Sequence, residues 1–130
     1  MRIYLAARYD RREELRAVAA RLEAAGHEVT SVWIYGLREG VSDLAAAVED
    51  IDGVAVADCV VSFTEEPTAH VAWAARGGRH VEFGLALAMG KRLCVVGPRE
   101  NVFHHLQQVE LYPTIAALIE AFSAPMEVAS

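Results

Sequence analysis

Short apolar, β-branched runs alternate with longer segments of helical periodicity along this chain, and no other feature restricts its fold as strongly. The strand-like runs are residues 2–7, 27–34, 59–64, 92–97 and 109–112. The helix-like segments are residues 10–26, 43–57, 79–89 and 113–122. Strands separated by helices favour right-handed crossovers and a mostly parallel sheet. The sequence therefore predicts an α/β fold: a flavodoxin-like or Rossmann-like three-layer sandwich around a mostly parallel five-stranded sheet.

Residues that start or stop helices support these boundaries. We expect Asp10 to cap the first helix and Gly26 to end it. Ser42 is expected to cap the second helix, and Gly90 to end the third. Pro113 suits the first turn of the last helix, because its fixed φ fits the helix there.

Length and charge limit the classes of protein to consider. The 130 residues fit one domain, expected over 1–122, followed by a tail at 123–130. A formal net charge of −6 argues against binding to polymeric nucleic acid, which needs a broad basic surface. A few local arginines can still form a positive pocket, so a small anionic ligand remains compatible with this charge.

The sequence also suggests where the protein works. Cys59 and Cys94 both lie in apolar, strand-like runs, which predicts buried free thiols in a reducing compartment. The first ten residues lack the apolar length of a signal peptide, and no apolar stretch approaches the ~20 residues of a membrane span. We expect a soluble, cytoplasmic protein.

The polar residues without an obvious structural role fall in loops that follow the predicted strands. These loops cover residues 6–8, 33–36, 64–78 and 97–105. Open parallel sheets bind ligands beyond the carboxyl ends of their strands, near the switch in strand order. We therefore expect the functional site at that edge.

Several common motifs are absent. The first strand is followed by "AARYDRR", so the glycine fingerprint of dinucleotide-binding folds is missing. The stretch "HVE" at 80–82 has the H-x-E spelling of a zinc deaminase but lacks the paired cysteines that this chemistry needs. We expect neither a metal nor a cofactor.

Glu82 is the strongest candidate for chemistry. It is expected in the first turn of its helix, where the dipole favours a charged carboxylate, and an ionised carboxylate can attack a sugar carbon. Gly77 and Gly78 let the backbone approach a ligand, while Arg79 and the helix N-terminus make an anion site to which Arg76 adds a second guanidinium. The alternative is that Glu82 only stabilises the helix start.

Asp50 and Tyr4 have functional and structural interpretations that the sequence leaves open. Asp50 belongs to an acidic group with Glu49 and Asp52, which a solvated helix face would also explain. Tyr4 lies in the first strand, where its side chain either reaches the strand ends or is an ordinary core aromatic. Trp33 and Trp73 either stack on a base or belong to the core or an interface.

Across about residues 2–120, the chain resembles the nucleoside 2-deoxyribosyltransferase superfamily, which includes the 2'-deoxynucleoside 5'-monophosphate N-hydrolases. One part of the resemblance is the "IY" opening strand with its Arg-rich loop, and another is the D-x7-D spacing from Asp50 to Asp58 before "CVVSF". The third part is the pattern G-x3-E-x-G-x-A-x-A-x2-K, formed by Gly78, Glu82, Gly84, Ala86, Ala88 and Lys91.

This resemblance implies roles for individual residues. Glu82 would be the nucleophile that attacks the anomeric carbon and expels the base. Asp50 would assist departure of the base, and Tyr4 would orient Glu82 by a hydrogen bond. Arg8 in the Arg-rich loop and the segment 76–80, which includes His80, would bind the substrate, the segment at the 5' end of the sugar. A homodimer or larger assembly is also implied, in which a neighbouring subunit completes the pocket through His104.

Two departures from the family pattern matter. The loop before Glu82 is longer than expected, with "PTAHVAWAA" inserted, and Arg76 stands six residues before Glu82, where transferases tend to place an acid. An arginine can pair with a phosphate, which favours a nucleoside 5'-monophosphate and hydrolysis. Transfer to a second base stays open, as does a catalytically silent nucleotide sensor; a purely structural protein explains the polar loop least well.

Overall fold

The computed structural model of the chain describes residues 1–36, 40–66 and 77–124. Five strands form one sheet in the order β2-β1-β3-β4-β5, and every neighbouring pair is parallel. The strands are β1 (Arg2–Ala6), β2 (Glu28–Val29), β3 (Cys59–Phe63), β4 (Arg92–Val96) and β5 (Val109–Tyr112). The described sheet is therefore parallel throughout.

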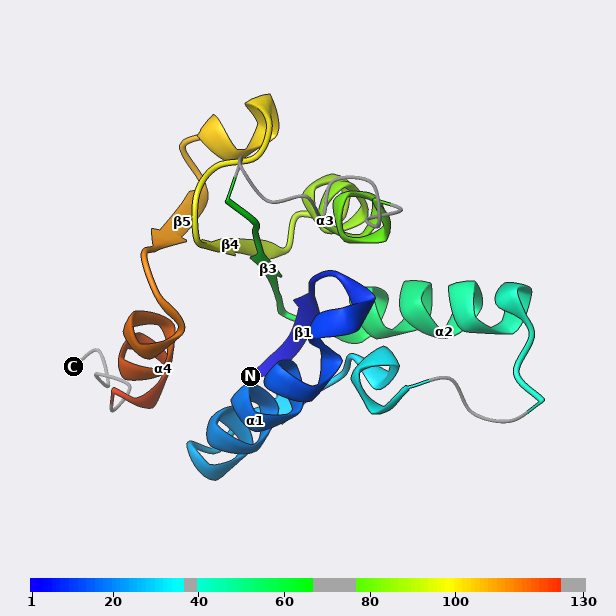
Figure 1. Cartoon of the computed structure of the whole chain (residues 1–130). Coiled ribbons are helices and arrows are strands. Elements are labelled where there is room, and N and C mark those ends of the chain that lie inside the picture. The colour runs from blue at the N-terminus through cyan, green and yellow to red at the C-terminus, as the bar shows by residue number, and fades with distance from the viewer. Residues whose placement is uncertain (37–39, 67–76, 125–130) are drawn as a thin grey trace.

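Two helices cover each face of this sheet (Figure 1). One face carries α1 (Arg12–Ala24) and α4 (Ile115–Ser123), and the other carries α2 (Asp43–Val56) and α3 (Gly78–Ala88). Alternate residues of each strand face opposite helices, so that Leu5 packs toward α1 whereas Tyr4 packs toward α2 and α3. The predicted three-layer α/β fold is confirmed.

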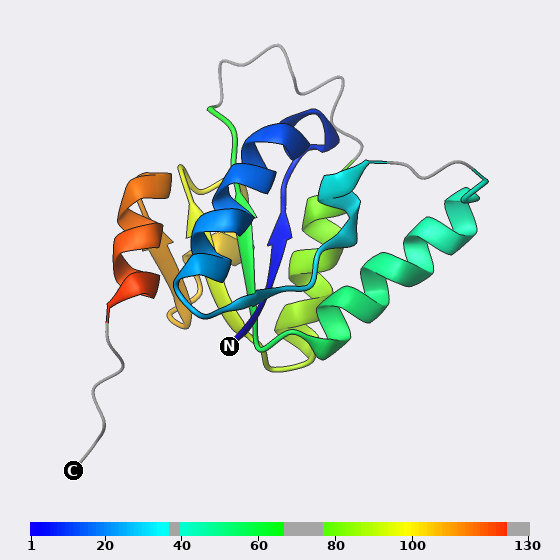
Figure 2. The same cartoon turned by 90° about the horizontal axis from the view of Figure 1, so that it is seen from below.

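The strand order reverses beside β1. The chain runs from β1 out to β2 on one side and returns to β3 on the other, which puts the switch point between β1 and β3. In Figure 2 the carboxyl end of β1 points to the top of the view, where α1 also begins. Ligands of such folds bind at this edge.

The second strand is much shorter than the predicted 27–34. After Val29 the chain turns into a 3-10 helix, Val32–Tyr35. Side chains that follow Val29 make the hydrogen bonds to β1 that a longer β2 would otherwise make. The hydroxyl oxygen of Ser31 accepts a hydrogen bond from the Leu5 N–H at 3.1 Å, and the Trp33 indole N–H donates to the Leu5 carbonyl at 2.7 Å. With both polar groups of Leu5 satisfied, no further strand residue is needed there.

Two predicted helix starts are also wrong. Asp10 does not cap α1: it lies inside a 3-10 turn, Tyr9–Arg11, and Arg11 is the N-cap. Pro113 precedes α4 instead of lying in its first turn. Thr114 caps that helix, and its hydroxyl accepts a hydrogen bond from the Ala117 N–H at 3.1 Å.

Three further capping predictions are confirmed. The hydroxyl of Ser42 caps α2 by accepting a hydrogen bond from the Ala45 N–H at 3.1 Å. Gly26 and Gly90 follow the C-caps of α1 and α3 with φ values of +96° and +70°, a conformation that suits glycine.

Cys59 and Cys94 are buried and free, as predicted. Within the described ranges, no helix has the length and apolarity to cross a membrane.

Candidate active site

The three residues predicted to carry chemistry meet between the sheet and helices α2 and α3. Tyr4 projects from β1, Asp50 comes from α2 and Glu82 comes from α3. The Tyr4 side chain is fully buried, and burial raises the pKa of its hydroxyl. Both carboxylates raise that pKa further, Glu82 more than Asp50, so the Tyr4 hydroxyl lies within the field of both.

Helix α2 is brought close to Tyr4 by a glycine. A Cβ on Gly53 would lie 2.9 Å from Cε2 of the Tyr4 ring and 2.9 Å from the Thr30 carbonyl oxygen. The helix backbone therefore rests directly on the ring. Asp50 is three residues earlier in α2, on the same side of the helix, so this close packing directs it toward Tyr4 as well.

Glu82 lies deeper in its helix than predicted. Because α3 begins at Gly78, Glu82 is its fifth residue, and the first turn contains no acidic residue. Its Oε1 is 3.8 Å from the position that a Cβ on Gly78 would take, so the side chain extends back toward the helix start. Its Oε2 is buried without a hydrogen-bond partner in the described part of the chain.

The surroundings of the Glu82 carboxyl oppose its charged form, which the sequence led us to expect at the start of the helix. Burial raises the pKa of Glu82 to about 8. The Tyr4 hydroxyl lowers this pKa in part, and Asp50 raises it. Burial also raises the pKa of Asp50, as does Glu49, and Tyr4 again opposes the change. Both carboxyls can therefore carry protons closer to neutral pH than ordinary acids do.

Asp50 also lines a pocket of ≈ 100 Å³ between α2 and the 3-10 helix Val32–Tyr35. The Tyr9 and Trp33 rings form part of its wall, with centroids 6.4 Å apart. The other lining residues are Val32, Gly36, Val41, Ala46 and Glu49. Trp33 packs on the core and also lines the pocket, and its stacking on a base stays a prediction. Trp73 lies outside the described residues. A flat apolar group would fit beside the Asp50 carboxyl.

Buried polar atoms without partners mark the same region. In the described ranges they are the Tyr4 hydroxyl, Ser62 Oγ, Glu82 Oε2 and His104 Nε2. Native proteins seldom leave such atoms unsatisfied, so each one calls for an explanation. Ser62 was not singled out from the sequence. The available sequence signal for Ser62 was a hydroxyl inside the apolar run "CVVSF", two residues after Val60 and therefore on the same face of the strand.

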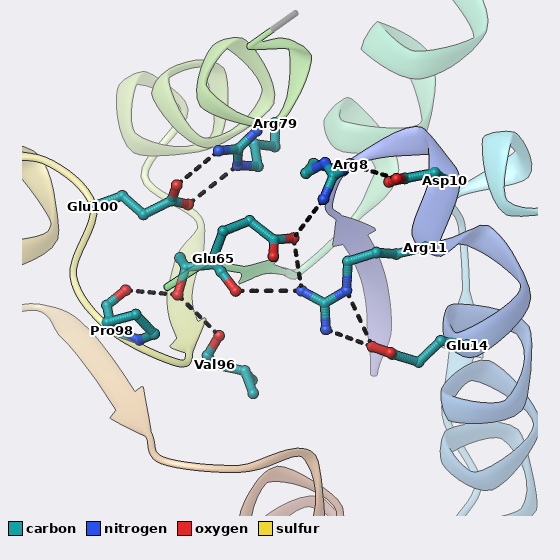
Figure 3. Close-up of polar contacts among 10 residues, drawn as sticks. Arg8, Asp10, Arg11, Glu14, Glu65, Arg79, Val96, Pro98 and Glu100 are labelled. Carbon is teal, nitrogen blue, oxygen red and sulfur yellow. Dashed lines mark hydrogen bonds and ion pairs between the residues drawn. The ribbon is translucent and has the colours of Figure 1, made fainter. Parts of the chain in front are cut away.

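Arginines and glutamates form ion pairs at the carboxyl edge of the sheet (Figure 3). Arg8 pairs with Asp10, and its Nη1 lies 3.9 Å from Glu65 Oε1. Arg11 pairs with Glu14, and its Nη1 lies 3.3 Å from the same Glu65 oxygen. Glu65 therefore faces two guanidinium groups at the end of β3, as a phosphate at that position would.

Arg79 has a different partner from the one predicted. Its guanidinium donates two hydrogen bonds to the Glu100 carboxylate, at 2.7 and 3.1 Å, and the side chain is only 7% exposed. Arg79 thus ties the start of α3 to the loop after β4, with its charge already balanced. Arg76, the second predicted guanidinium, lies outside the described residues.

Gly77 and Gly78 open α3, as the sequence suggested. Gly77 is the N-cap, with a φ of +80° that a residue with a side chain would adopt only under strain. The pair begins α3, whose first backbone N–H groups have no partner within the helix, on the side toward which Glu82 extends.

The two predicted histidines lie inside their own chain. His104 is 1% exposed, its Nδ1 accepts a hydrogen bond from the Glu100 N–H at 3.0 Å, and its ring meets Phe83 edge-on at 4.9 Å. His104 is thus buried within its own chain, and its contribution to the pocket of a neighbouring subunit stays a prediction. His80 is half-buried beside Asn101, and burial lowers the pKa of both histidines. Among described residues, no group of three potential ligands is placed to hold a metal.

No family model and no curated protein matches this chain. It is similar to a solved structure, that of Clostridium botulinum CMP N-glycosidase, BcmB. The TM-score is 0.65 at 22% sequence identity, and the match covers 93% of this chain and 97% of the other. At this identity the likeness shows a shared fold along nearly the whole length of both chains.

Proposed function

We propose that this protein breaks the N-glycosidic bond of a nucleoside or a nucleoside 5'-monophosphate, with the sugar passing through a covalent bond to Glu82. One observation carries the proposal: Tyr4, Asp50 and Glu82 converge from three separate elements, and the converging atoms include a buried carboxylate oxygen without a partner. A chain that only folded would gain nothing from gathering two acids around a buried hydroxyl.

The proposed reaction uses the two carboxyls in different protonation states. Ionised Glu82 attacks the anomeric carbon, the bond from that carbon to the base breaks, and a glycosyl ester forms on Glu82. Asp50, whose pKa is raised, donates a proton to the departing base. Water then attacks the ester carbon, loses its proton to Asp50 and releases the sugar and Glu82. A second base in place of water gives transfer instead.

The pocket beside Asp50 is the proposed site for the base. Its aromatic wall suits a planar ring, and Asp50 belongs both to that wall and to the Tyr4–Glu82 group. A base in the pocket would place its glycosidic bond next to both acids. The fold shared with a protein described as a CMP N-glycosidase supports this assignment.

A 5'-phosphate would bind at the carboxyl edge of the sheet. The proposed donors are the backbone N–H groups at Gly77 and Gly78, toward which Glu82 extends, together with Arg8 after β1, which would exchange its contacts with Asp10 and Glu65 for the phosphate. Arg79 supports this edge through Glu100 and is assigned no direct phosphate contact. A cytoplasmic homodimer remains part of the proposal, and sedimentation velocity measures its assembly state.

A chromatographic assay of base release tests the proposal. The purified protein is incubated with ribo- and deoxyribonucleosides and their 5'-monophosphates, with and without a free acceptor base. Base released without acceptor indicates hydrolysis, and a new nucleoside formed only with acceptor indicates transfer. Glu82→Gln is expected to lose activity by roughly 10³-fold or more, since the amide cannot act as the nucleophile. A wild-type protein that changes no substrate would support the silent nucleotide sensor.

A further inference from the structure

Ser62 differs from the other serine buried in this fold. Ser31 is 1% exposed, and its Oγ accepts a hydrogen bond from the Leu5 N–H at 3.1 Å. Ser62 is 0% exposed, and its Oγ has no hydrogen-bond partner in the described part of the chain. A buried hydroxyl without a partner costs free energy and gives the fold nothing in return. The Ser62 hydroxyl therefore needs an explanation outside the packing of the protein.

The Ser62 side chain lies on the same face of the sheet as Tyr4. Val60, two residues before it, packs on the α2 and α3 side and is the register partner of Tyr4. Ser62 itself pairs with Ala6 on β1 and Val95 on β4, both of which belong to that face. It thus lies about 7 Å further along the strands than the Tyr4 level, toward the carboxyl edge where ligands bind.

The order of strands separates Ser62 from the proposed base pocket. That pocket lies between α2 and the 3-10 helix Val32–Tyr35, which follows β2. Ser62 is on β3, on the opposite side of β1 from β2. A substrate whose base occupied the pocket and whose anomeric carbon faced Glu82 would extend its sugar toward β3. The fold therefore directs the sugar, not the base, to Ser62.

We infer that Ser62 is a substrate-binding residue whose hydroxyl makes a hydrogen bond to a pentose hydroxyl. The inference rests on the proposed function and assigns its sugar site to β3. It also explains the partnerless oxygens together: Tyr4 and Glu82 act at the anomeric carbon, and Ser62 fixes the ring beside them. The sugar hydroxyl supplies the partner that the Ser62 Oγ lacks within the described residues.

The first arm of the test measures the stability of the protein without substrate. Ser62→Ala removes a hydroxyl without a partner, so its Tm is expected to equal or exceed that of the wild type. Ser31→Ala is the matched control. It leaves the Leu5 N–H unsatisfied and is expected to lower Tm by roughly 3–6 °C. A similar fall in Tm for Ser62→Ala would show that its hydroxyl supports the fold, and would overturn the inference.

The second arm compares kcat/KM for ribonucleoside, 2'-deoxy and 3'-deoxy 5'-monophosphates of the same base. Two of the three sugars carry the contacted hydroxyl. For these, Ser62→Ala is expected to reduce kcat/KM roughly fivefold, as the loss of one hydrogen bond implies. For the analogue that lacks this hydroxyl, the wild type and variant should be equal. Ser31→Ala should show no such dependence on the sugar.

The outcomes separate this inference from the proposed function. An active wild type whose Ser62→Ala variant is unchanged on every sugar, or equally impaired on all three, would overturn the role of Ser62 alone. A wild type inactive on all substrates, with Glu82→Gln no different, would overturn the proposed function and the sugar contact with it. A loss of kcat/KM on the two sugars that carry the contacted hydroxyl, no loss on the analogue that lacks it, and a retained Tm establish the contact.

Discussion

At the scale of single residues, the protonation state of one carboxyl matters most. Glu82 lies partly buried in the second turn of α3, and burial raises its pKa to about 8 from an ordinary value of 4.5. Folding therefore favours its protonated form. Glu82 must therefore lose its proton before it attacks, and the positive charge that develops on the sugar ring favours the resulting anion.

This pKa predicts how stability varies with pH. Glu82 takes up a proton more readily in the folded than in the unfolded chain, so its contribution is fully present below pH 4.5 and is lost as pH rises through about 8. Glu82→Gln should remove this dependence and make the free energy of unfolding flatter between pH 5 and 8, by more than about 1 kcal/mol. Urea denaturation at a series of pH values measures the difference.

Glu110 provides a control, because its pKa is shifted in the opposite direction to that of Glu82. The guanidinium of Arg92 lowers the pKa of Glu110, so its contribution is present above its ordinary pKa and is lost in acid. Glu110→Gln should therefore change the acid side of the profile and leave the range from pH 5 to 8 as it is. A Glu82→Gln profile parallel to that of the wild type in this range would contradict the buried, raised carboxyl.

At the scale of elements, the site exists because α2 rests on the ring of Tyr4. Gly53→Ala would place a Cβ 2.9 Å from that ring and 2.9 Å from a backbone oxygen of Thr30, so α2 or the ring must move. We expect a loss of stability of about 1–3 kcal/mol, together with a fall in kcat as the Tyr4 hydroxyl leaves its position. Thermal unfolding and base release measure the two effects.

Gly84 provides the matched substitution. It lies in the interior of α3, and a Cβ there would meet nothing within 4 Å. Gly84→Ala should raise stability by roughly 0.5–1 kcal/mol, because it removes the entropic cost of a helical glycine. If Gly53→Ala behaved like Gly84→Ala, the close packing of α2 on Tyr4 would not hold.

The start of α3 is held to the loop after β4 by one buried ion pair. Arg79→Ala would leave the Glu100 carboxylate without its partner and should cost about 3–5 kcal/mol. Arg92 pairs with Glu110 on the surface, with both side chains more than a third exposed, and Arg92→Ala should cost at most about 1 kcal/mol. Chemical denaturation of the two variants compares them, and equal losses would contradict the structural role of Arg79.

At the scale of the whole molecule, the sequence was sufficient for the architecture. Hydrophobic periodicity predicted the layers because the three central strands, β1, β3 and β4, are buried on both faces, and apolar runs signal such burial directly. The length of β2 was not predictable in the same way. It depends on Ser31 and Trp33 bonding to Leu5 through their side chains, which is a tertiary arrangement.

The candidate site was predictable in part for the same reason. Glu82 could be proposed from its residue type beside the glycine- and arginine-rich segment, whereas Asp50 and Tyr4 were proposed through the family resemblance. The fold places both carboxyls around the Tyr4 hydroxyl. The Arg79–Glu100 pair and the burial of His104 depend on contacts between α3 and the loop after β4, which spacing along the chain does not reveal. Ser62 escaped notice because an absent hydrogen-bond partner is a property of the folded chain alone.

If the sugar becomes covalently attached to Glu82, the product must keep the anomeric configuration of the substrate. A β-nucleoside 5'-monophosphate is turned over in water containing methanol, and the methyl glycoside, which does not interconvert between anomers, is examined by proton NMR. Two displacements at the same carbon predict the β-anomer, formed with retention, and none from Glu82→Gln. The α-anomer would mean a single displacement by methanol and would contradict a glycosyl–Glu82 intermediate.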